Sequence, residues 1–152
     1  MSYSDSSTWV LVKTERERRP LLIRFRQFPG GLPRATYSQR ISIVWKLSDP
    51  DENGLPSDEE FDKLAAFEDR VMAAVEHDQH SIFTVMLSGN GESEFVFYTA
   101  DVPGFIERLR SMPQEVERHP ISIHQYDDSN WTYFEAVIPE NCRDEIRGKE
   151  QD

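Results

Sequence analysis

Oxygen-bearing side chains in the stretch DPDENGLPSDEE, residues 49–60, have the spacing of a calcium-binding loop. Loops of this type take side-chain oxygens from their first, third and fifth positions and a bidentate carboxylate from the twelfth, with glycine at the sixth for a sharp turn. The four side-chain ligand positions here hold Asp49, Asp51, Asn53 and Glu60. Gly54 occupies the turn position, so these four residues are candidate calcium ligands.

The sequence on either side of this stretch favours a different role for it. A calcium loop of this kind follows a helix, whereas RISIVWKL, residues 40–47, alternates apolar and polar residues and predicts a strand. On the other side, Ser57 and Glu60 have the spacing of a capping box, in which the Glu60 side chain bonds back to the Ser57 backbone N–H. We therefore interpret residues 49–60 as a polar connector that leads into a helix cap, with a solitary calcium site as the alternative.

Other residue types that support catalysis do not form a motif. Cys142, the single cysteine, lies in a charged stretch that does not favour an activated thiolate. SGNGES, residues 88–93, lacks the lysine and hydroxyl residue of a phosphate-binding loop. His77 and His80 come at the end of a predicted helix, where the helix dipole favours histidine. The sequence thus favours a non-enzymatic protein with no cofactor and no metal, although abundant carboxylates leave acid–base catalysis open.

Five side chains are candidates for binding a partner. Residues 13–46 hold nine basic and two acidic residues, a net of +7, in a chain whose net charge is −11. We expect this basic segment to attract the acidic remainder within one fold or in a dimer, with an anion- or nucleic-acid-binding face as the alternative. His124 alternates with Ile121 and Ile123 and should lie on the sheet face away from the helices. Aromatic side chains on that face would add to an interaction patch. The candidates are Arg24, Arg26, Tyr98, His124 and Trp131.

The hydrophobic pattern predicts an α+β domain with an antiparallel sheet. Runs of alternating or continuous apolar residues predict strands, separated by polar turns and by Gly- and Pro-containing loops. The expected strands cover residues 8–14, 21–28, 40–47, 81–87, 94–99, 120–126 and 131–139. Apolar residues at steps of three and four predict helices over residues 57–77 and 101–112, with N-caps at Ser57 and Asp101.

From residue 40 onward the predicted order is strand, helix, strand, strand, helix, strand, which is the split βαβ or ferredoxin-like arrangement. We expect two helices on one face of the sheet and no helix on the other. An N-terminal hairpin and an extra C-terminal strand would extend the sheet. A single domain is expected over residues 8–139, with flexible tails at residues 1–7 and 140–152.

Composition indicates a folded protein of the cytoplasm. The chain has 152 residues, of which 38% are hydrophobic, and this length allows a substantial core. No apolar run approaches the roughly 18 residues that span a bilayer, and the N-terminus has no secretory signal pattern. A single cysteine fits a reducing compartment. We expect a monomer or a homodimer without membrane contact.

Several stretches resemble a bacterial family, the domain-of-unknown-function family number 695. GLPSDEEFDKLAAFEDRV matches its acidic-capped helix, and EFVFYTAD and DDSNWTYFEAVIP are similar to stretches seen in that family and in the regulator of ribonuclease E activity B type. The resemblance covers residues 9–139 and implies a ferredoxin-like α+β domain with no established catalytic residues. Its regulator-like C-terminal half implies an acidic protein that binds another protein. The signature positions are Phe97, Tyr98, Asp128, Trp131 and Phe134.

These observations lead to one main expectation and two alternatives. The main expectation is a non-enzymatic cytoplasmic protein that binds or regulates another macromolecule, in the first place a protein and not a nucleic acid, because strong net negative charge repels phosphate backbones. One alternative is a small-ligand, metal-binding or enzymatic domain that uses a cleft on the open sheet face. The other is an acidic inhibitor of a basic toxin or nuclease.

Overall fold

The computed structural model describes residues 9–28, 30–113 and 120–142. The described chain begins with a β-hairpin and ends with a short 3-10 helix. The elements are β1 (Trp9–Arg16), β2 (Arg19–Arg26), β3 (Gln39–Lys46), α1 (Asp58–Val75), β4 (Ser81–Gly89), β5 (Glu92–Thr99), α2 (Val102–Arg110), β6 (Ile121–Asp127), α3 (Thr132–Val137) and η1 (Glu140–Cys142). The structure is therefore of the α+β class.

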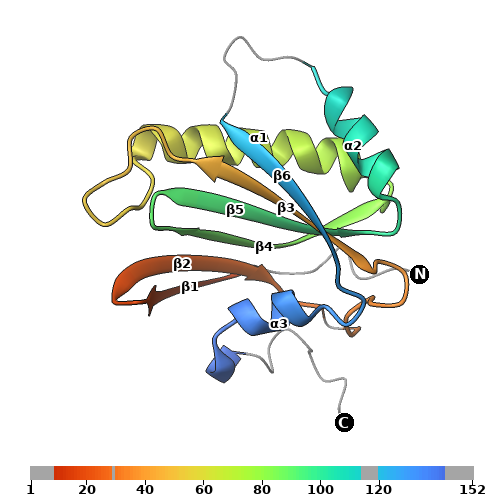
Figure 1. Cartoon of the computed structure of the whole chain (residues 1–152), viewed down its shortest axis with the longest axis horizontal. Helices are drawn as coiled ribbons and strands as arrows, with labels where there is room; N and C mark the ends of the chain where they lie inside the picture. The colour runs from red at the N-terminus through yellow and green to blue at the C-terminus, as the bar shows by residue number, and fades with distance from the viewer. Residues whose placement is uncertain (1–8, 29, 114–119, 143–152) are drawn as a thin grey trace.

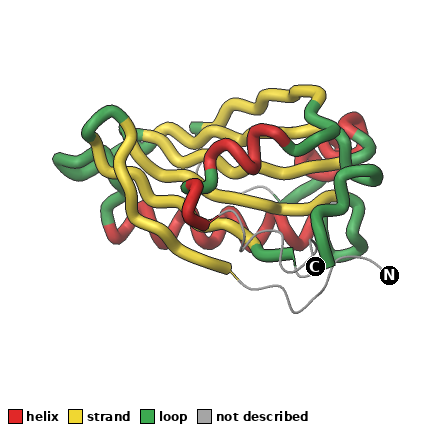
Figure 2. Tube along the Cα trace, turned by 90° about the horizontal axis from the view of Figure 1, so that it is seen from below, coloured by secondary structure: helices red, strands yellow, loops and turns green. Residues whose placement is uncertain are grey.

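The strands form one antiparallel sheet in the order β1-β2-β4-β5-β3-β6. Helices α1 and α2 cover one face of this sheet, and α3 lies against the other (Figure 1). The view from below shows α3 crossing the strands on that second face (Figure 2). The described chain thus has apolar cores on both sides of the sheet.

Strand alternation divides the side chains between the two cores. In β2, Leu21, Ile23 and Phe25 point to the α3 side, while Arg24 and Arg26 point toward α1. The core between the sheet and α1 and α2 contains Ile41, Ile43, Trp45, Leu47, Leu64, Phe67, Val71, Val75, Phe83, Phe95, Phe97 and Phe105. Because almost every central strand buries both faces, the sheet has little freedom to slip in register.

Helix α1 begins where the sequence predicts. Ser57 is its N-cap, and the Ser57 Oγ accepts a hydrogen bond from the Glu60 backbone N–H at 3.2 Å. Asp101 caps α2 in the same way through the Gly104 N–H at 3.1 Å. Both helices are amphipathic, and their apolar sides pack on β3, β4 and β5. No helix in the described ranges is long and apolar enough to cross a membrane.

The extra C-terminal strand expected over residues 131–139 is wrong, because this segment forms helix α3. Asp128 begins it: its carboxylate accepts hydrogen bonds from the backbone N–H groups of Thr132 (2.8 Å) and Tyr133 (3.1 Å). Trp131 adopts a left-handed backbone conformation (φ 56°, ψ 37°) that turns the chain out of the sheet. The buried side chains of Trp131, Phe134 and Ile138 then recur at steps of three and four, which is a helical and not a strand period. The face expected to be free of helices is consequently filled in part.

Candidate functional site

The calcium-like loop uses its last carboxylate for structure. Glu60 is buried, and its carboxylate accepts hydrogen bonds from the Trp45 indole Nε1 (3.0 Å) and from the backbone N–H groups of Ser48 (2.9 Å) and Asp49 (3.1 Å). Burial raises the pKa of Glu60, but the hydrogen bonds from Trp45, Ser48 and Asp49 outweigh burial, so the pKa lies below its usual value. The expected return bond of the capping box is replaced by this bond network, which ties the start of α1 to the end of β3.

The rest of the loop is a compact turn. The Asp51 Oδ1 accepts hydrogen bonds from the backbone N–H groups of Asn53 (2.8 Å) and Leu55 (2.9 Å). Gly54 has φ +82° and packs so closely on the β4–β5 turn that a side-chain carbon would lie 3.0 Å from the Asn90 backbone nitrogen. No cluster of three or more His, Cys, Asp or Glu side chains suited to a metal occurs among the described residues. The Glu60 and Asp51 side chains are thus hydrogen-bond acceptors in this connector, and Asp49 and Asn53 donate to them through their backbone N–H groups.

Arg24 and Arg26 lie between the sheet and α1. Arg24 forms an ion pair with Glu68 and stacks over the Trp9 ring at 4.5 Å. Arg26 is buried, pairs with Glu76 at 2.6 Å, and donates from Nη1 to the Phe83 carbonyl at 3.0 Å. The basic hairpin is thus held by acidic side chains of α1, which explains part of the charge segregation in the sequence.

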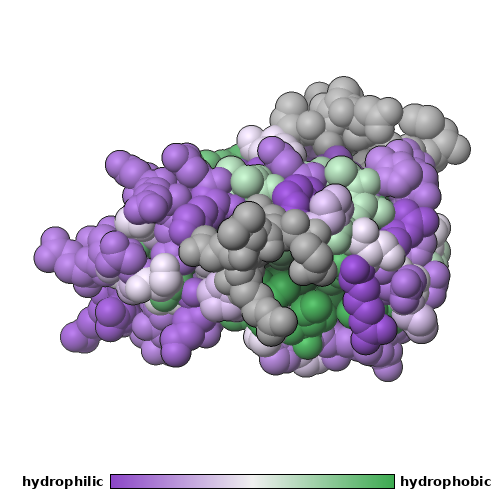
Figure 3. All heavy atoms as spheres, turned by 90° about the horizontal axis from the view of Figure 1, so that it is seen from above, coloured by the Kyte–Doolittle hydropathy of each residue, from purple (hydrophilic) through white to green (hydrophobic). Residues whose placement is uncertain are grey.

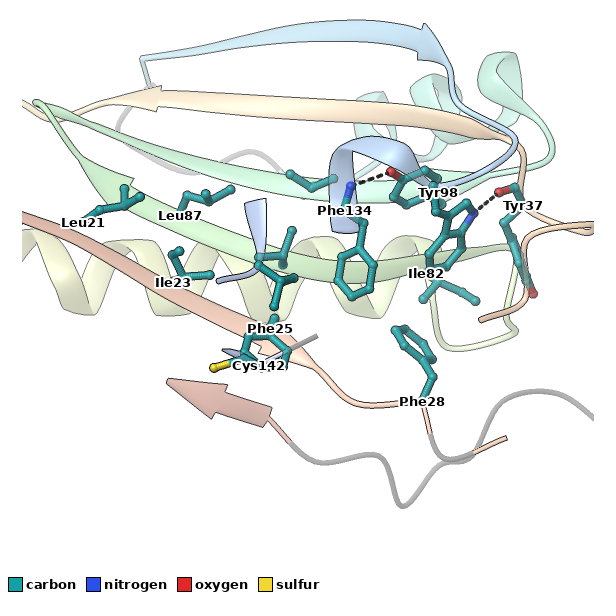
Figure 4. Close-up of a cluster of buried hydrophobic side chains, with 14 residues drawn as sticks. Leu21, Ile23, Phe25, Phe28, Tyr37, Ile82, Leu87, Tyr98, Phe134 and Cys142 are labelled. Carbon is teal, nitrogen blue, oxygen red and sulfur yellow. Dashed lines mark hydrogen bonds between the residues drawn. The ribbon is translucent and has the colours of Figure 1, made fainter. Parts of the chain in front are cut away.

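Tyr98 and Trp131 belong to the core on the other side of the sheet, and Figure 4 shows Tyr98 beside α3. Their rings stack with centroids 4.2 Å apart and planes at 17°. The Tyr98 hydroxyl donates to the Asp128 Oδ2 at 2.6 Å and accepts from the Phe134 N–H at 3.3 Å, while the Trp131 Nε1 donates to the Tyr37 carbonyl at 2.7 Å. Burial, together with Asp128, raises the pKa of Tyr98. Both side chains hold α3 to the sheet and are fully buried.

Cys142 also belongs to this side of the sheet. It lies in η1, is buried, and contributes to the core beneath α3, so the packed chain continues beyond residue 139. Burial of the thiol among apolar side chains is typical of a structural cysteine.

A serine–histidine–aspartate arrangement occurs where sequence reasoning did not look for one. His80 Nδ1 lies 2.9 Å from the Ser81 Oγ, and His80 Nε2 lies 3.2 Å from the Asp101 Oδ2. A hydrolytic serine must reach substrate, yet Ser81 is fully buried and its hydroxyl donates to the Thr99 Oγ1 at 2.8 Å. Asp101 also serves as the α2 N-cap. The arrangement fastens α2 to the start of β4 and offers no nucleophile to a substrate.

A polar surface remains on the α3 side of the sheet, where β3 and β6 extend past α3. We call it the Arg40 face and define it by Arg40 and Ser42 of β3, His124 and Tyr126 of β6, and Tyr133 of α3. In the strand register Arg40 pairs with Tyr126, and Ser42 with His124. Paired residues of an antiparallel ladder share a face of the sheet, so these side chains are neighbours.

Arg40 lies at the centre of this face. Its guanidinium carbon is 4.0 Å from the Tyr126 ring centroid and 3.8 Å from that of Tyr133. Such cation–π contacts hold the charge in place without using its hydrogen-bond donors. The Tyr133 hydroxyl donates to the Glu94 Oε1 at 2.7 Å, and burial, followed by Glu94, raises the pKa of Tyr133.

Two polar atoms of the Arg40 face are enclosed without a hydrogen-bond partner, Arg40 Nε and Ser42 Oγ. Ser42 is only 2% exposed. His124, which pairs with Ser42 across the ladder, is exposed and has a 3.1 Å contact with the Ser122 Oγ. Among the described residues no third group orients this His–Ser pair, so it does not assemble a catalytic triad.

Of the five binding candidates read from the sequence, His124 is exposed and Arg24 is partly exposed, whereas Arg26, Tyr98 and Trp131 are buried. Sequence reasoning did not single out Arg40, Tyr126 or Tyr133. The available signal was the polar alternation of Arg40 and Ser42 in an otherwise apolar strand. The place of Tyr133 on this face could not be predicted from the sequence, because it depends on residues 132–137 forming a helix.

Strand β6 forms one edge of the described sheet and pairs with β3. Residues Ser122–Asp127 are exposed, including Ile123 (39%) and Tyr126 (45%). From Ile121 to Tyr126 it carries no Asp, Glu, Lys or Arg. The opposite edge, β1, carries Lys13, Glu15 and Arg16.

The helix-covered face has a different character. Figure 3 shows it as largely hydrophilic with one apolar area. A shallow groove of about 310 Å³ on this side is lined by Arg70, Ala73, Ala74, Arg108, Ser111, Met112 and Pro113. Arg108 is committed to a bidentate pair with Asp78 at 2.9 and 3.0 Å. The groove therefore offers mainly apolar surface.

A comparison with protein families confirms one part of the sequence resemblance, the similarity to family number 695. No curated protein and no solved structure matches the chain. The family model described as "Family of unknown function (DUF695)" matches residues 7–137. These residues span the sheet, the three helices and every side chain of the Arg40 face. The chain belongs to the DUF695 family of unknown function.

Proposed function

We propose that this protein binds another protein by pairing an extended segment of the partner with β6, and that it does so without catalysing a reaction. The observation that carries the proposal is the exposed edge of β6, which has no Asp, Glu, Lys or Arg from Ile121 to Tyr126. Sheet edges of this kind are templates for an added strand, and native proteins usually protect them with charges or proline.

The hydrogen-bond pattern of β6 identifies which backbone groups a partner would use. Lys46 N–H donates to the Pro120 carbonyl and Asp128 N–H donates to the Ser38 carbonyl, both at the β3–β6 seam. Antiparallel pairs alternate between bonded and non-bonded positions, so the even-numbered residues of β6 bond to β3. Ile121, Ile123, Gln125 and Asp127 therefore direct their N–H and C=O groups away from the sheet.

The other edge is less suited to strand addition. β1 carries charged side chains at Lys13, Glu15 and Arg16, which oppose pairing with a second strand. This contrast between the two edges supports β6 as the docking strand.

The proposal also covers the type of fold, the cellular role and the oligomeric state. We propose that residues 39–127 form a ferredoxin-like unit, supported by the strand order β4-β5-β3-β6 with helices after β3 and β5. The C-terminal half resembles the regulator of ribonuclease E activity B type in sequence, which supports a bacterial, cytoplasmic, protein-binding role. A monomer or a homodimer paired through β6 is compatible with this role, with no membrane or nucleic-acid partner.

Proline variants of the full chain test the proposal. Ile123→Pro removes an outward N–H without breaking a bond to β3. Leu11→Pro is the matched change on β1. Glu15 of β1 pairs with Pro20, which has no N–H, so the odd-numbered residues of β1, including Leu11, direct their N–H groups away from β2. Each variant would be used as bait in cells that express the protein natively, with quantitative mass spectrometry and a thermal melt of each purified variant.

We expect a partner that is retained by wild type and Leu11→Pro and is reduced at least tenfold with Ile123→Pro. Its binding segment, as a synthetic peptide, should bind wild type and not Ile123→Pro. Retention of every partner by Ile123→Pro, or loss that is specific to Leu11→Pro, would show that β6 is not the docking strand. Recovery of no partner would contradict the proposed function itself.

A further inference from the structure

We propose that the Arg40 face is a binding site for a carboxylate group, with Arg40 as its anchor. This site is separate from the outward backbone groups of β6 and does not depend on strand pairing. Arg40 is a half-buried cation, and charged side chains that leave water are usually paired with an opposite charge. Among the described residues no carboxylate oxygen lies within ion-pair distance of its guanidinium.

The nearby acids are committed to other groups. Glu94 accepts from the Tyr133 hydroxyl at 2.7 Å, and Asp128 accepts from the Tyr98 hydroxyl and from backbone N–H groups at the start of α3. Within the described residues Arg16, Arg18, Arg19 and Arg110 also have no ion pair, but they are exposed to solvent, whereas Arg40 is half-buried. Arg40 is half-buried and its Nε is enclosed, so the part of the side chain that meets solvent includes its outer nitrogens.

The two tyrosine rings determine how a ligand approaches. The Tyr126 and Tyr133 ring centroids lie 4.0 and 3.8 Å from the guanidinium carbon, and the N–H donors of a guanidinium lie in its own plane. In that plane the N–H donors form a fork that matches the two oxygens of a carboxylate. A planar monoanion fits this approach, whereas a tetrahedral phosphate with up to two charges meets greater repulsion from the acidic protein.

Ser42 supplies the second, independent observation. Its hydroxyl is enclosed, has no hydrogen-bond partner, and lies on the same face two residues from Arg40. Burying an unpaired polar group is costly, and such groups often mark a place for an absent ligand or water. His124 pairs with Ser42 across the ladder and is exposed, so the Ser42 hydroxyl has a solvent-exposed residue of the edge strand as its neighbour.

The test is a titration of the full chain followed by two-dimensional NMR, with sodium acetate as the probe and sodium chloride at equal ionic strength as the reference. We expect saturable shifts of the Arg40 Nε–H and of the Ser42 and His124 amides, with a Kd on the order of millimolar. Arg40→Gln should weaken binding at least tenfold, and Ser42→Ala should weaken it severalfold. Arg110→Gln, the same charge change on exposed α2, should leave it unchanged.

Further arms separate the alternatives. Arg40→Lys keeps the charge but lacks the fork, so it should bind acetate as weakly as Arg40→Gln; the NMR spectrum of each variant shows whether it is folded. Acetyl-glutamate amide compared with acetyl-glutamine amide tests a peptide side chain as the source of the carboxylate, and a difference in favour of glutamate supports it.

Three results would overturn the proposal. One is that the NMR shifts are the same in sodium acetate and in sodium chloride at equal ionic strength. Another is tighter binding of inorganic phosphate than of acetate, and the third is unchanged affinity in Arg40→Gln. Ile123→Pro should bind acetate like wild type, so failure of the β6 proposal and failure of the carboxylate site are distinguishable.

Discussion

The Glu60 carboxylate accepts a hydrogen bond from the Trp45 indole Nε1 at 3.0 Å, which joins the first turn of α1 to the end of β3. The same carboxylate accepts from two backbone N–H groups at Ser48 and Asp49. The strand, the connector and the helix therefore share one buried acceptor. The carboxylate at the last position of the calcium-like pattern thus joins two elements of the fold.

Replacing Glu60 should destabilise the fold. Glu60→Ala leaves the Trp45 and Ser48 donors unpaired and should lower the free energy of unfolding by about 2–4 kcal/mol, because each buried unpaired donor costs roughly 1–3 kcal/mol. Glu60→Gln retains one carbonyl acceptor and should cost less. Urea denaturation measures both; equal stability of Glu60→Ala and wild type would mean that the network contributes nothing.

The stability of the protein should depend on pH through ionisation of the Glu60 carboxylate. The pKa of Glu60 is lower in the folded protein than the ordinary glutamate value of 4.5, so the stability that Glu60 contributes is fully present above about pH 4.5 and is lost as pH falls through the folded pKa. Urea midpoints measured between pH 3 and pH 7 should therefore fall less steeply on the acid side in Glu60→Gln than in wild type. An identical slope would contradict the assignment.

Calcium should not bind the 49–60 loop with useful affinity. Glu60 and Asp51 are engaged by backbone and indole N–H donors, and binding an ion would require those bonds to break. Isothermal titration with CaCl₂ should give no site tighter than about 1 mM, the weak end of dedicated sites. A tighter site that disappears in Asp49→Asn/Asp51→Asn would show the loop to be a real calcium site.

Tyr98 should make the protein sensitive to alkali. The pKa of its buried hydroxyl is raised above 10, so the stability it contributes is present below pH 10 and is lost as pH rises toward the folded pKa. Tyr98→Phe should lower stability at pH 7 by about 1–3 kcal/mol, since the Phe134 N–H loses its acceptor. It should also flatten the decline above pH 10. Thermal melts between pH 7 and pH 11 test both effects.

The β1–β2 turn offers a stabilising substitution. Glu17 and Arg18 both have positive φ (54° and 68°), as a two-residue turn of type I′ requires. Non-glycine residues in this region cost about 1 kcal/mol each, so Glu17→Asn/Arg18→Gly should raise the melting temperature by several degrees. Glu15→Asn/Arg16→Gly, a matched change inside β1, should lower it. A lower melting temperature for the turn variant would contradict this reading.

Local patterns in the sequence determined most of the elements. Alternating or continuous apolar runs predicted the strands that became β1 to β6, and the caps at Ser57 and Asp101 marked the starts of α1 and α2. The failure lay at residues 131–139, where strand-favouring aromatics follow a strand. A helix there depends on Asp128 as cap and on the left-handed turn at Trp131. Tertiary packing outweighed intrinsic preference, because three buried side chains fit the sheet only at helical spacing.

Tertiary structure alone decided which side chains meet. Arg40 reaches Tyr126 because β3 and β6 are neighbours in the sheet, and it reaches Tyr133 because α3 folds back over β5. The partners of Glu60, Arg26 and Tyr98 likewise come from segments distant in the chain. Spacing along a sequence encodes the period of an element and the position of its caps. Contacts across elements depend on strand order and register, which arise only when the whole core is packed.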